Sequence, residues 1–307
     1  MAKLPDPQPD FRPEPGAPVS LAPGLRRILA PNPSPMTFRG TNTYLVGTQD
    51  IAVIDPGPDD PDHLSAILGA LRPGQRISHI LVTHAHIDHT ALVPRLARET
   101  GAPVYGFGPV GAGRSALMAE LAASGALSGG EGLDHAYAPD IVLQDGMAVT
   151  GAGWRLEALH LPGHMADHLG FALDRTLFCG DLVMGWSTSL ISPPDGDLAA
   201  FMASLDRLKT RDWQVLLPGH GAPVDAPSDR IQALIAHRQA RADAVHAALA
   251  RAPADAETLA KAIYTDTPPA LLPAAARNVL AQLIAFHEAG IARFDGPLHA
   301  GSVFRLT

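Results

Sequence analysis

The chain has 307 residues, of which 46% are hydrophobic and 18% are charged, and its formal net charge is −8. This composition is typical of a globular protein of about two domains, and the negative charge disfavours a broad nucleic-acid-binding surface. A single cysteine, Cys179, excludes an intrachain disulfide and agrees with a reducing compartment.

Residues 1–35 form a proline-rich arm that has no basic stretch followed by an apolar one. The sequence therefore predicts neither a secretory signal nor a membrane span in this region. We expect a cytoplasmic protein without a membrane partner.

Two apolar strands are predicted next, at residues 43–46 after a turn-rich loop and at residues 51–54. The second strand ends at Asp55, which precedes a Pro-Gly pair and by itself indicates a turn. An Asp-Pro pair at residues 60–61 has the character of an N-cap and a first helical residue. The helix that it begins leads to a further apolar strand at residues 80–82.

Residues 83–90, Thr-His-Ala-His-Ile-Asp-His-Thr, carry the densest group of polar side chains. The apolar run before them predicts a buried strand, so these side chains lie at its carboxyl end, where open α/β sheets bind ligands. Four of these side chains, His84, His86, Asp88 and His89, can bind a metal ion. They cannot all be buried without partners, because an unpaired buried polar group costs roughly 1–3 kcal/mol. A metal ion would be a partner for all four.

Beyond this loop, residues 108–137 are rich in glycine, alanine and serine around one helical piece at residues 115–122. Long loops in compact domains are usually functional or mobile, so we expect either a rim over the site or a solvated surface insertion. The other predicted strands are 103–107, 140–143, 154–160, 169–173, 176–179 and 213–217, and the other helices are 91–99, 197–208 and one from Ser228, its cap, to about 251.

Three further candidate metal ligands stand where predicted strands end. His164, Asp181 and His220 each follow an apolar run and a glycine. Glycine permits the tight turn that directs a ligand back across a sheet edge. Together with residues 83–90, they predict a site for two metal ions.

The order of these motifs, a strand, H-x-H-x-D-H, P-G-H, G-D and a second P-G-H, resembles that of the metallo-β-lactamase superfamily of binuclear metal hydrolases. The resemblance implies an α/β fold, the αβ/βα sandwich, and two metal sites that share one carboxylate. The implied ligands are His84, His86 and His164 for one ion, Asp88, His89 and His220 for the other, and Asp181 as the bridge.

A narrower resemblance covers nearly the whole chain. The Gly40–Gly47 loop, the Pro162–His168 segment and a tail of helices followed by a β-hairpin look like the lactamase-beta-like hydrolases that include a mitochondrial endoribonuclease. This resemblance implies that Asp55 braces the metal loop from behind. His168 matches a family histidine, for which we expect hydrogen bonding behind the site, with contact to substrate as the alternative.

The tail, with helices expected at 255–264 and 271–289, looks like a small winged-helix unit. We therefore divide the chain into a hydrolase domain, residues 1–252, and a winged-helix-like domain, residues 253–307. From residue 251 onward, five Lys and Arg balance five Asp and Glu, whereas a nucleic-acid-binding unit needs a basic face. We expect the tail to serve packing or contacts in a homodimer.

The site predicts a hydrolase in which a hydroxide that bridges two metal ions attacks the substrate. Imidazole and carboxylate donors without thiolate favour two Zn²⁺ ions, although iron or manganese accepts the same donors. Asp88 is the candidate to orient the hydroxide and carry a proton to the leaving group. We expect a small ester, thioester or lactone as substrate; the alternatives are cleavage of single-stranded RNA and a non-enzymatic, nucleic-acid-binding regulator that kept the fold.

Overall fold

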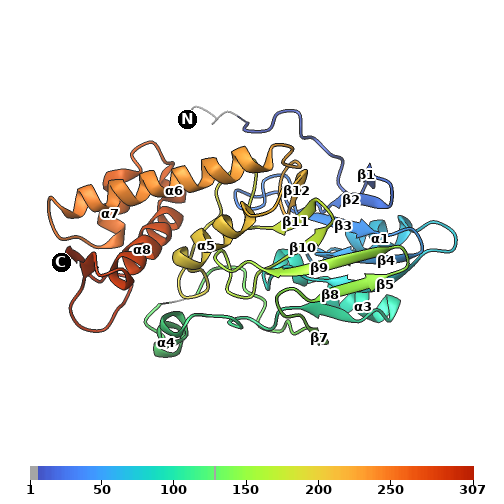
Figure 1. Cartoon of the computed structure of the whole chain (residues 1–307), viewed down its shortest axis with the longest axis horizontal. Coiled ribbons are helices and arrows are strands. Elements are labelled where there is room, and N and C mark those ends of the chain that lie inside the picture. The colour runs from blue at the N-terminus through green and yellow to red at the C-terminus, as the bar shows by residue number, and fades with distance from the viewer. Residues whose placement is uncertain (1–5, 128) are drawn as a thin grey trace.

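A computed structural model describes residues 6–127 and 129–307 of the chain. Two β-sheets lie face to face, helices cover their outer faces, and a helical C-terminal unit adjoins one end (Figure 1). The first five residues of the predicted proline-rich arm lie outside the described residues.

The first sheet has seven strands in the order β1-β2-β3-β4-β5-β6-β7. Neighbours from β1 to β4 run antiparallel and those from β4 to β7 run parallel, so β4 and β5 end at the same edge of the sheet. The strands span Val19–Ala22 (β1), Leu25–Leu29 (β2), Asn42–Val46 (β3), Asp50–Ile54 (β4), Arg76–Leu81 (β5), Val104–Gly106 (β6) and Ile141–Val142 (β7).

The second sheet has five strands in the order β12-β11-β10-β9-β8. Only β11 and β12 are parallel neighbours, and the other pairs are antiparallel. The strands span Ala148–Gly151 (β8), Trp154–His160 (β9), Leu169–Leu173 (β10), Thr176–Gly180 (β11) and Val215–Pro218 (β12).

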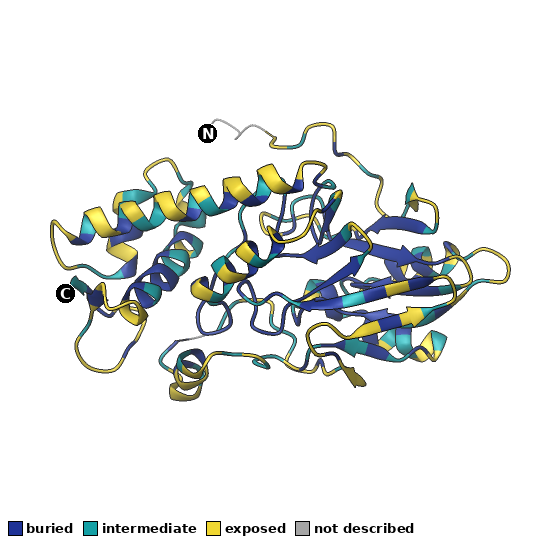
Figure 2. Cartoon of the chain, in the orientation of Figure 1, coloured by how far each residue is buried: buried dark blue, intermediate teal, exposed yellow. Residues whose placement is uncertain are grey.

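Alternation along the strands supplies apolar side chains to both faces of the first sheet. In β3, Tyr44 and Val46 enter the core between the two sheets, whereas Leu45 enters the core on the outer face. Phe171 and Phe178 fill the inner core from the second sheet. Both sheets are consequently buried over most of their length (Figure 2).

Helices cover the outer face of each sheet. α1 (Pro61–Gly69) and α3 (Val93–Thr100) pack on the first sheet, and α5 (Leu198–Leu208) and α6 (Pro227–Leu249) pack on the second. A single helical turn, α2 (Ile87–Thr90), lies between β5 and α3. The four layers form an αβ/βα sandwich, so the predicted fold class is confirmed.

Local signals in the sequence located most helix starts. Asp60 caps α1 by accepting a hydrogen bond from a first-turn amide at 2.7 Å, and Asp197 caps α5 in the same way. The cap predicted at Ser228 is wrong, because α6 already begins at Pro227, after Ala226. The fixed φ of proline suits the first helical position, which makes a side-chain cap unnecessary there.

Three strands, β1, β2 and β8, were not predicted from the sequence. Prolines stand immediately beside β1, at Pro18 and Pro23, and they obscure a short strand in a proline-rich region. β2 is buried because it pairs along its whole length with β3. β8 is a four-residue edge strand with one buried side chain, Val149, and so has little apolar signal.

The C-terminal unit contains α7 (Ala256–Ile263), a 3-10 turn (Pro269–Leu271), α8 (Leu272–Glu288) and a hairpin of β13 (Ala292–Arg293) and β14 (Arg305–Leu306). Its core also contains side chains from the end of α6 and from α4. The unit therefore shares its core with the larger part of the chain, and a boundary after residue 252 stays a prediction.

The glycine-rich stretch 108–137 lies between residues 83–90 and the C-terminal unit. On one side, the Ile87 amide donates to the Gly132 carbonyl at 2.7 Å. On the other side, α4 (Ala116–Ser124) packs Met118 into the C-terminal core. The stretch therefore borders the polar loop and is held in place by the C-terminal helices.

One helix, Pro269–Glu288, is long and apolar enough to span a membrane by length and composition alone, with a mean hydropathy of 1.3. A helix in the core of a globular unit passes the same test. Leu283 and Ile284 of this helix are buried in the C-terminal core, which accounts for its apolar character.

Replacing Leu283 with alanine is expected to lower the free energy of unfolding by about 2–5 kcal/mol, because the side chain is fully buried and its loss leaves a cavity. Val303→Ala is the control, since Val303 is 51% exposed and its truncation should change stability by less than about 0.5 kcal/mol. Denaturant unfolding measures both; equal midpoints for the two variants would contradict the prediction.

Candidate metal centre

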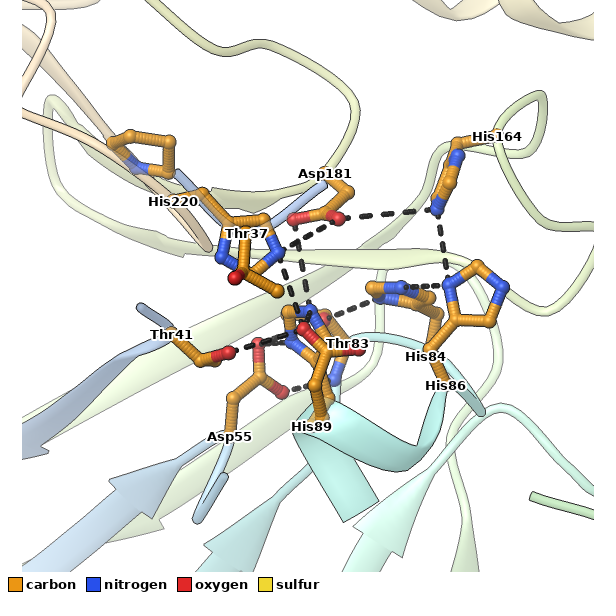
Figure 3. A network of polar contacts seen from close by, with 12 residues as sticks. Thr37, Thr41, Asp55, Thr83, His84, His86, His89, His164, Asp181 and His220 are labelled. Atoms are coloured by element: carbon orange, nitrogen blue, oxygen red, sulfur yellow. Dashed lines mark hydrogen bonds and ion pairs between the residues drawn. The ribbon is translucent and has the colours of Figure 1, made fainter. Parts of the chain in front are cut away.

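Seven imidazole and carboxylate side chains gather at the edge of the sandwich where β5, β11 and β12 end and where the loop after β9 returns (Figure 3). These are the seven residues predicted from the sequence as metal ligands, and the structure brings all of them together. They are His84, His86, Asp88 and His89 after β5, His164 after β9, Asp181 after β11 and His220 after β12.

Backbone hydrogen bonds between the two sheets hold this edge together. The Asn42 amide, at the start of β3, donates to the Gly219 carbonyl at 2.7 Å, and the Leu169 amide of β10 donates to the Thr83 carbonyl at 2.7 Å. The Asn42 side chain also donates to the Pro218 carbonyl at 3.0 Å. Ligands from different sheets are thereby fixed relative to one another.

Glycine is required beside three of the ligands. Gly163, before His164, has a φ of +148°, and a Cβ there would lie 2.4 Å from the Phe201 backbone. Gly180, before Asp181, has a φ of +46°, and a Cβ there would lie 2.6 Å from the His168 ring. Gly219, before His220, has no room for a side chain, because a Cβ would overlap the Asp181 carboxylate. The turn role expected for these glycines is confirmed at Gly163 and Gly180, which have a positive φ, whereas Gly219 is needed for space.

The ligand atoms form three groups in which all atoms lie within 4.8 Å of one another. In the first group, His86 Nδ1 lies 2.9 Å from His84 Nε2 and 3.1 Å from His164 Nε2. The second group joins His84 and His89 to Asp181, and the third joins Asp88, His89 and His220. Asp181 faces several groups at once, since its two oxygens lie 3.7 Å from His89 Nε2, 3.2 Å from His220 Nε2 and 3.9 Å from His164 Nε2.

Hydrogen bonds behind the rings determine which nitrogen faces the site. The Nδ1 atoms of His164 and His220 donate to backbone carbonyls, of Leu190 at 2.7 Å and of Gly40 at 3.2 Å. His89 Nδ1 donates to the Asp55 carboxylate at 2.9 Å. Each ring therefore turns Nε2 toward the site, and this is the nitrogen that would bind a metal ion.

His84 reaches the same tautomer through a relay. The Thr83 hydroxyl donates its proton to Asp55 at 2.8 Å, so it can only accept from His84 Nδ1, 3.0 Å away. Asp55 also accepts from the Thr83 amide at 2.8 Å. The bracing contact expected of Asp55 is therefore confirmed: this one buried carboxylate orients two candidate ligands and the loop that carries them.

The donor set fits a metal ion. Within residues 6–127 and 129–307, His89 Nε2 and one carboxylate oxygen of Asp181 are buried and have no hydrogen-bond partner, and such unpaired polar atoms are costly. A divalent cation would satisfy both. Cys179 lies outside this donor set, since its buried thiol donates to the Val183 carbonyl at 3.2 Å.

Burial and the facing carboxylates divide the histidines into two kinds. Burial lowers the pKa of His86 to about 3 and also lowers the pKa values of His84 and His164, so these rings are neutral near pH 7. Burial also acts against charge on His220, but the carboxylates of Asp181 and Asp88 outweigh it and raise the pKa of His220 to about 10. A metal ion bound at His220 must therefore displace a proton.

His168 lies behind the site, as expected. Its Nε2 accepts a hydrogen bond from the Asp181 amide at 3.1 Å, and its ring stacks on His84 with centroids 5.1 Å apart. Burial lowers the pKa of His168 well below the usual value, so the ring is the neutral acceptor that this amide needs. His168 thus positions the backbone of the bridging candidate.

Thr41 also belongs to the site, although it was not predicted from the sequence. Its hydroxyl donates to the Asp88 carboxylate at 3.0 Å, and its backbone bridges to His220. The sequence signal was the polar run Gly40-Thr41-Asn42-Thr43 before an apolar strand. That run showed no ligand spacing, because Thr41 reaches the site through an isolated backbone bridge to His220, which is distant in the chain.

A family model described as the metallo-beta-lactamase superfamily matches residues 36–220, and one described as the beta-lactamase associated winged helix domain matches residues 256–297. A beta-lactamase-like protein 2 homolog of Drosophila melanogaster is 32% identical over 84% of this chain and 86% of that protein. An atrochrysone carboxyl ACP thioesterase of Cryptosporiopsis is 31% identical over 71% of this chain and 60% of that protein.

Solved structures show the same architecture. A beta-lactamase domain protein from Burkholderia ambifaria has a TM-score of 0.79 and 23% identity, with 98% of this chain and 96% of that chain covered. A metallo-beta-lactamase family protein from Thermus thermophilus has a TM-score of 0.74 and 26% identity, with 94% and 100% covered. This coverage extends the structural likeness to the C-terminal unit.

Asp55→Asn is expected to weaken metal affinity by roughly 10–100-fold, because the new amide group cannot both accept from His89 and hold the Thr83 loop. Competition with a zinc chelator measures the affinity. Asp59→Asn is the matched control, since Asp59 is exposed on the same connection and pairs only with Arg95. Equal affinities in the two variants would show that Asp55 does not orient the ligands.

Metal affinity is expected to fall as the pH is lowered from about 8 to about 6. The pKa of His220 in the metal-free protein is raised to about 10, so the ring is protonated throughout that range. A metal ion that binds His220 must therefore displace this proton. Apparent affinity should drop on the order of tenfold per pH unit for each proton displaced. Chelator competition at several pH values, corrected for the chelator, tests this; a flat profile would contradict it.

Proposed function

Because the chain belongs to the metallo-β-lactamase superfamily of hydrolases, we propose that it is a binuclear metal-dependent hydrolase of a small ester, thioester or lactone. The convergence of seven imidazole and carboxylate ligands at one buried edge supports this most directly. The two sets on either side of Asp181 would each hold one ion. They are His84, His86 and His164 for the first and Asp88, His89 and His220 for the second, with Asp181 shared.

Two divalent ions held there would lower the pKa of a bound water and polarise the bond under attack. We propose zinc, because nitrogen and oxygen donors without thiolate suit it, as they also suit iron and manganese. The neutral rings of His84, His86 and His164 are ready to bind without losing a proton.

Asp88 is proposed to move the proton. Its carboxylate accepts from Thr41 at 3.0 Å and lies 3.2 Å from His220 Nε2 and 3.4 Å from His89 Nε2. Burial raises its pKa, but the facing His89 and His220 hold it well below the usual range, so Asp88 is ionised. The Asp88 side chain is 26% exposed and that of Asp181 is 10% exposed, so Asp88 is the more accessible of the two carboxylates.

In this role, Asp88 takes a proton from the attacking water while the oxygen of that water bonds to the acyl carbon. The bond from that carbon to the leaving oxygen or sulfur then breaks, and Asp88 returns the proton to the leaving group. The products are a carboxylic acid and an alcohol or thiol.

The choice of an acyl substrate rests on the relatives and on charge. Two fungal relatives, 31% and 32% identical, are named as acyl-carrier-protein thioesterases. The C-terminal unit offers little to RNA, since Lys261 pairs with Glu257 at 2.6 Å and Arg305 pairs with Asp295 at 2.7 Å. A phosphate-binding surface needs unpaired cations.

A panel of substrates tests the proposal. The zinc-loaded protein should hydrolyse an acyl thioester or a lactone and leave single-stranded RNA intact, and a chelator should abolish the activity. Metal-dependent cleavage of RNA without thioester or lactone hydrolysis would favour the endoribonuclease alternative. Binding of RNA without any hydrolysis would favour the regulator.

Asp181→Ala is expected to reduce metal content from about two ions per chain to one or fewer and to lower turnover at least about a hundredfold, since the shared carboxylate is lost. Elemental analysis after gel filtration, paired with thioesterase or lactonase assays, measures both effects. Asp225→Ala, at an exposed carboxylate outside the site, is the control. Full metal content in Asp181→Ala would rule out the bridging role.

A further inference from the structure

We infer that Asn278, in α8 of the C-terminal unit, is a positioning residue for two candidate metal ligands, and that it acts through Arg238 of α6 and residues 189–191. This inference rests on the proposed function, since it concerns how the chain holds its metal ligands. It assigns the C-terminal unit a part in the catalytic site.

The ligand end of this connection is the segment after β11. The Leu190 carbonyl accepts from His164 Nδ1 at 2.7 Å and so sets the orientation of that ring. The neighbouring Ser189 hydroxyl lies in hydrogen-bond contact with the Asp181 carbonyl and donates to the Leu182 carbonyl at 3.0 Å. Two adjacent residues therefore hold two ligands that come from different loops.

Helices α6 and α8 contact the same segment from the other side. Arg238 donates from Nη2 to the Ser189 carbonyl and from Nη1 to Asn278 Oδ1 at 3.1 Å. Asn278 Oδ1 also accepts from the Ile191 amide at 3.0 Å. One amide oxygen of α8 thus ties together the arginine and the segment that holds the ligands.

The burial of Arg238 makes this contact stringent. The residue is 6% exposed, and its guanidinium lies over the Phe201 ring at 5.1 Å from the ring centroid. Among the described residues its guanidinium has two hydrogen-bond acceptors, the Ser189 carbonyl and Asn278 Oδ1, and its Nε has none. An uncompensated buried cation is costly, and this penalty resists any shift of Ser189 away from Arg238.

A role confined to packing would also bury Arg238, but it would not require these particular acceptors. The acceptors are the backbone of the residue beside Leu190 and a side chain that also holds Ile191. The contacts therefore enclose the one carbonyl that orients His164. Loss of Asn278 Oδ1 should loosen that carbonyl without emptying a large volume of core.

Four proteins test the inference: wild type, Asn278→Ala, Asn278→Asp and Gln282→Ala. Asn278→Asp keeps an acceptor oxygen for Ile191 and Arg238. Gln282→Ala is the matched control, because Gln282 lies one turn further along α8 and is 9% exposed. Zinc affinity is measured by chelator competition, and exchange of the Ile191 amide is measured on the metal-free proteins.

We expect Asn278→Ala to bind zinc roughly tenfold more weakly than wild type, as loss of supporting hydrogen bonds does in other metal sites. Its Ile191 amide should exchange about three- to tenfold faster, as expected for one lost hydrogen bond. Asn278→Asp and Gln282→Ala should match wild type in both measurements.

Unchanged zinc affinity in Asn278→Ala, in a wild-type background that binds zinc, would overturn this inference alone. An equal loss in Gln282→Ala would overturn it too, because any disturbance of α8 would then suffice. A wild-type protein that binds no zinc would overturn the proposed function and this inference with it.

Discussion

The rest of the structure depends on one electrostatic constraint: seven imidazole and carboxylate side chains are brought close together at one buried edge of the sandwich. Imidazole nitrogens and carboxylate oxygens face one another there at distances between 2.9 and 3.9 Å. Such groups either repel one another or hold protons, as the raised pKa of His220 indicates. A cation converts the same arrangement into a favourable one. The fit to a cation is therefore a property of the folded edge and not of any single motif.

This constraint extends outward from the ligands. Every ring that presents Nε2 to the site must have Nδ1 held from behind, which explains why buried polar groups such as Asp55 and Thr83 stand where apolar side chains would otherwise pack. The holders come from both sheets and from the loop before β3. The hydrogen bonds that join the sheets at Asn42 and Thr83 are consequently part of the site.

The C-terminal unit is best understood through the same constraint. It shares a core with α4 and α6, and several of its cations are paired with carboxylates. These features suit a unit that supports the sandwich more than one that grips phosphates. Asn278 of this unit contacts the segment after β11, and that segment in turn holds His164 and Asp181.

The sequence by itself determined the ligand types, their order and the strands that carry them, because an apolar run followed by glycine and a polar residue is a local signal. It placed β9 and β10 at their observed bounds and found the cap Asp60, because strand patterns and helix caps are local signals too. It did not determine β2, whose burial comes from pairing with β3, or β1, a short and largely exposed strand that pairs with β2. Only the tertiary structure decided which ring nitrogens face the site. It also decided that Thr41, Arg238 and Asn278 contribute to it. Those contacts join residues that are distant in the chain and meet only when the two sheets and α8 pack together.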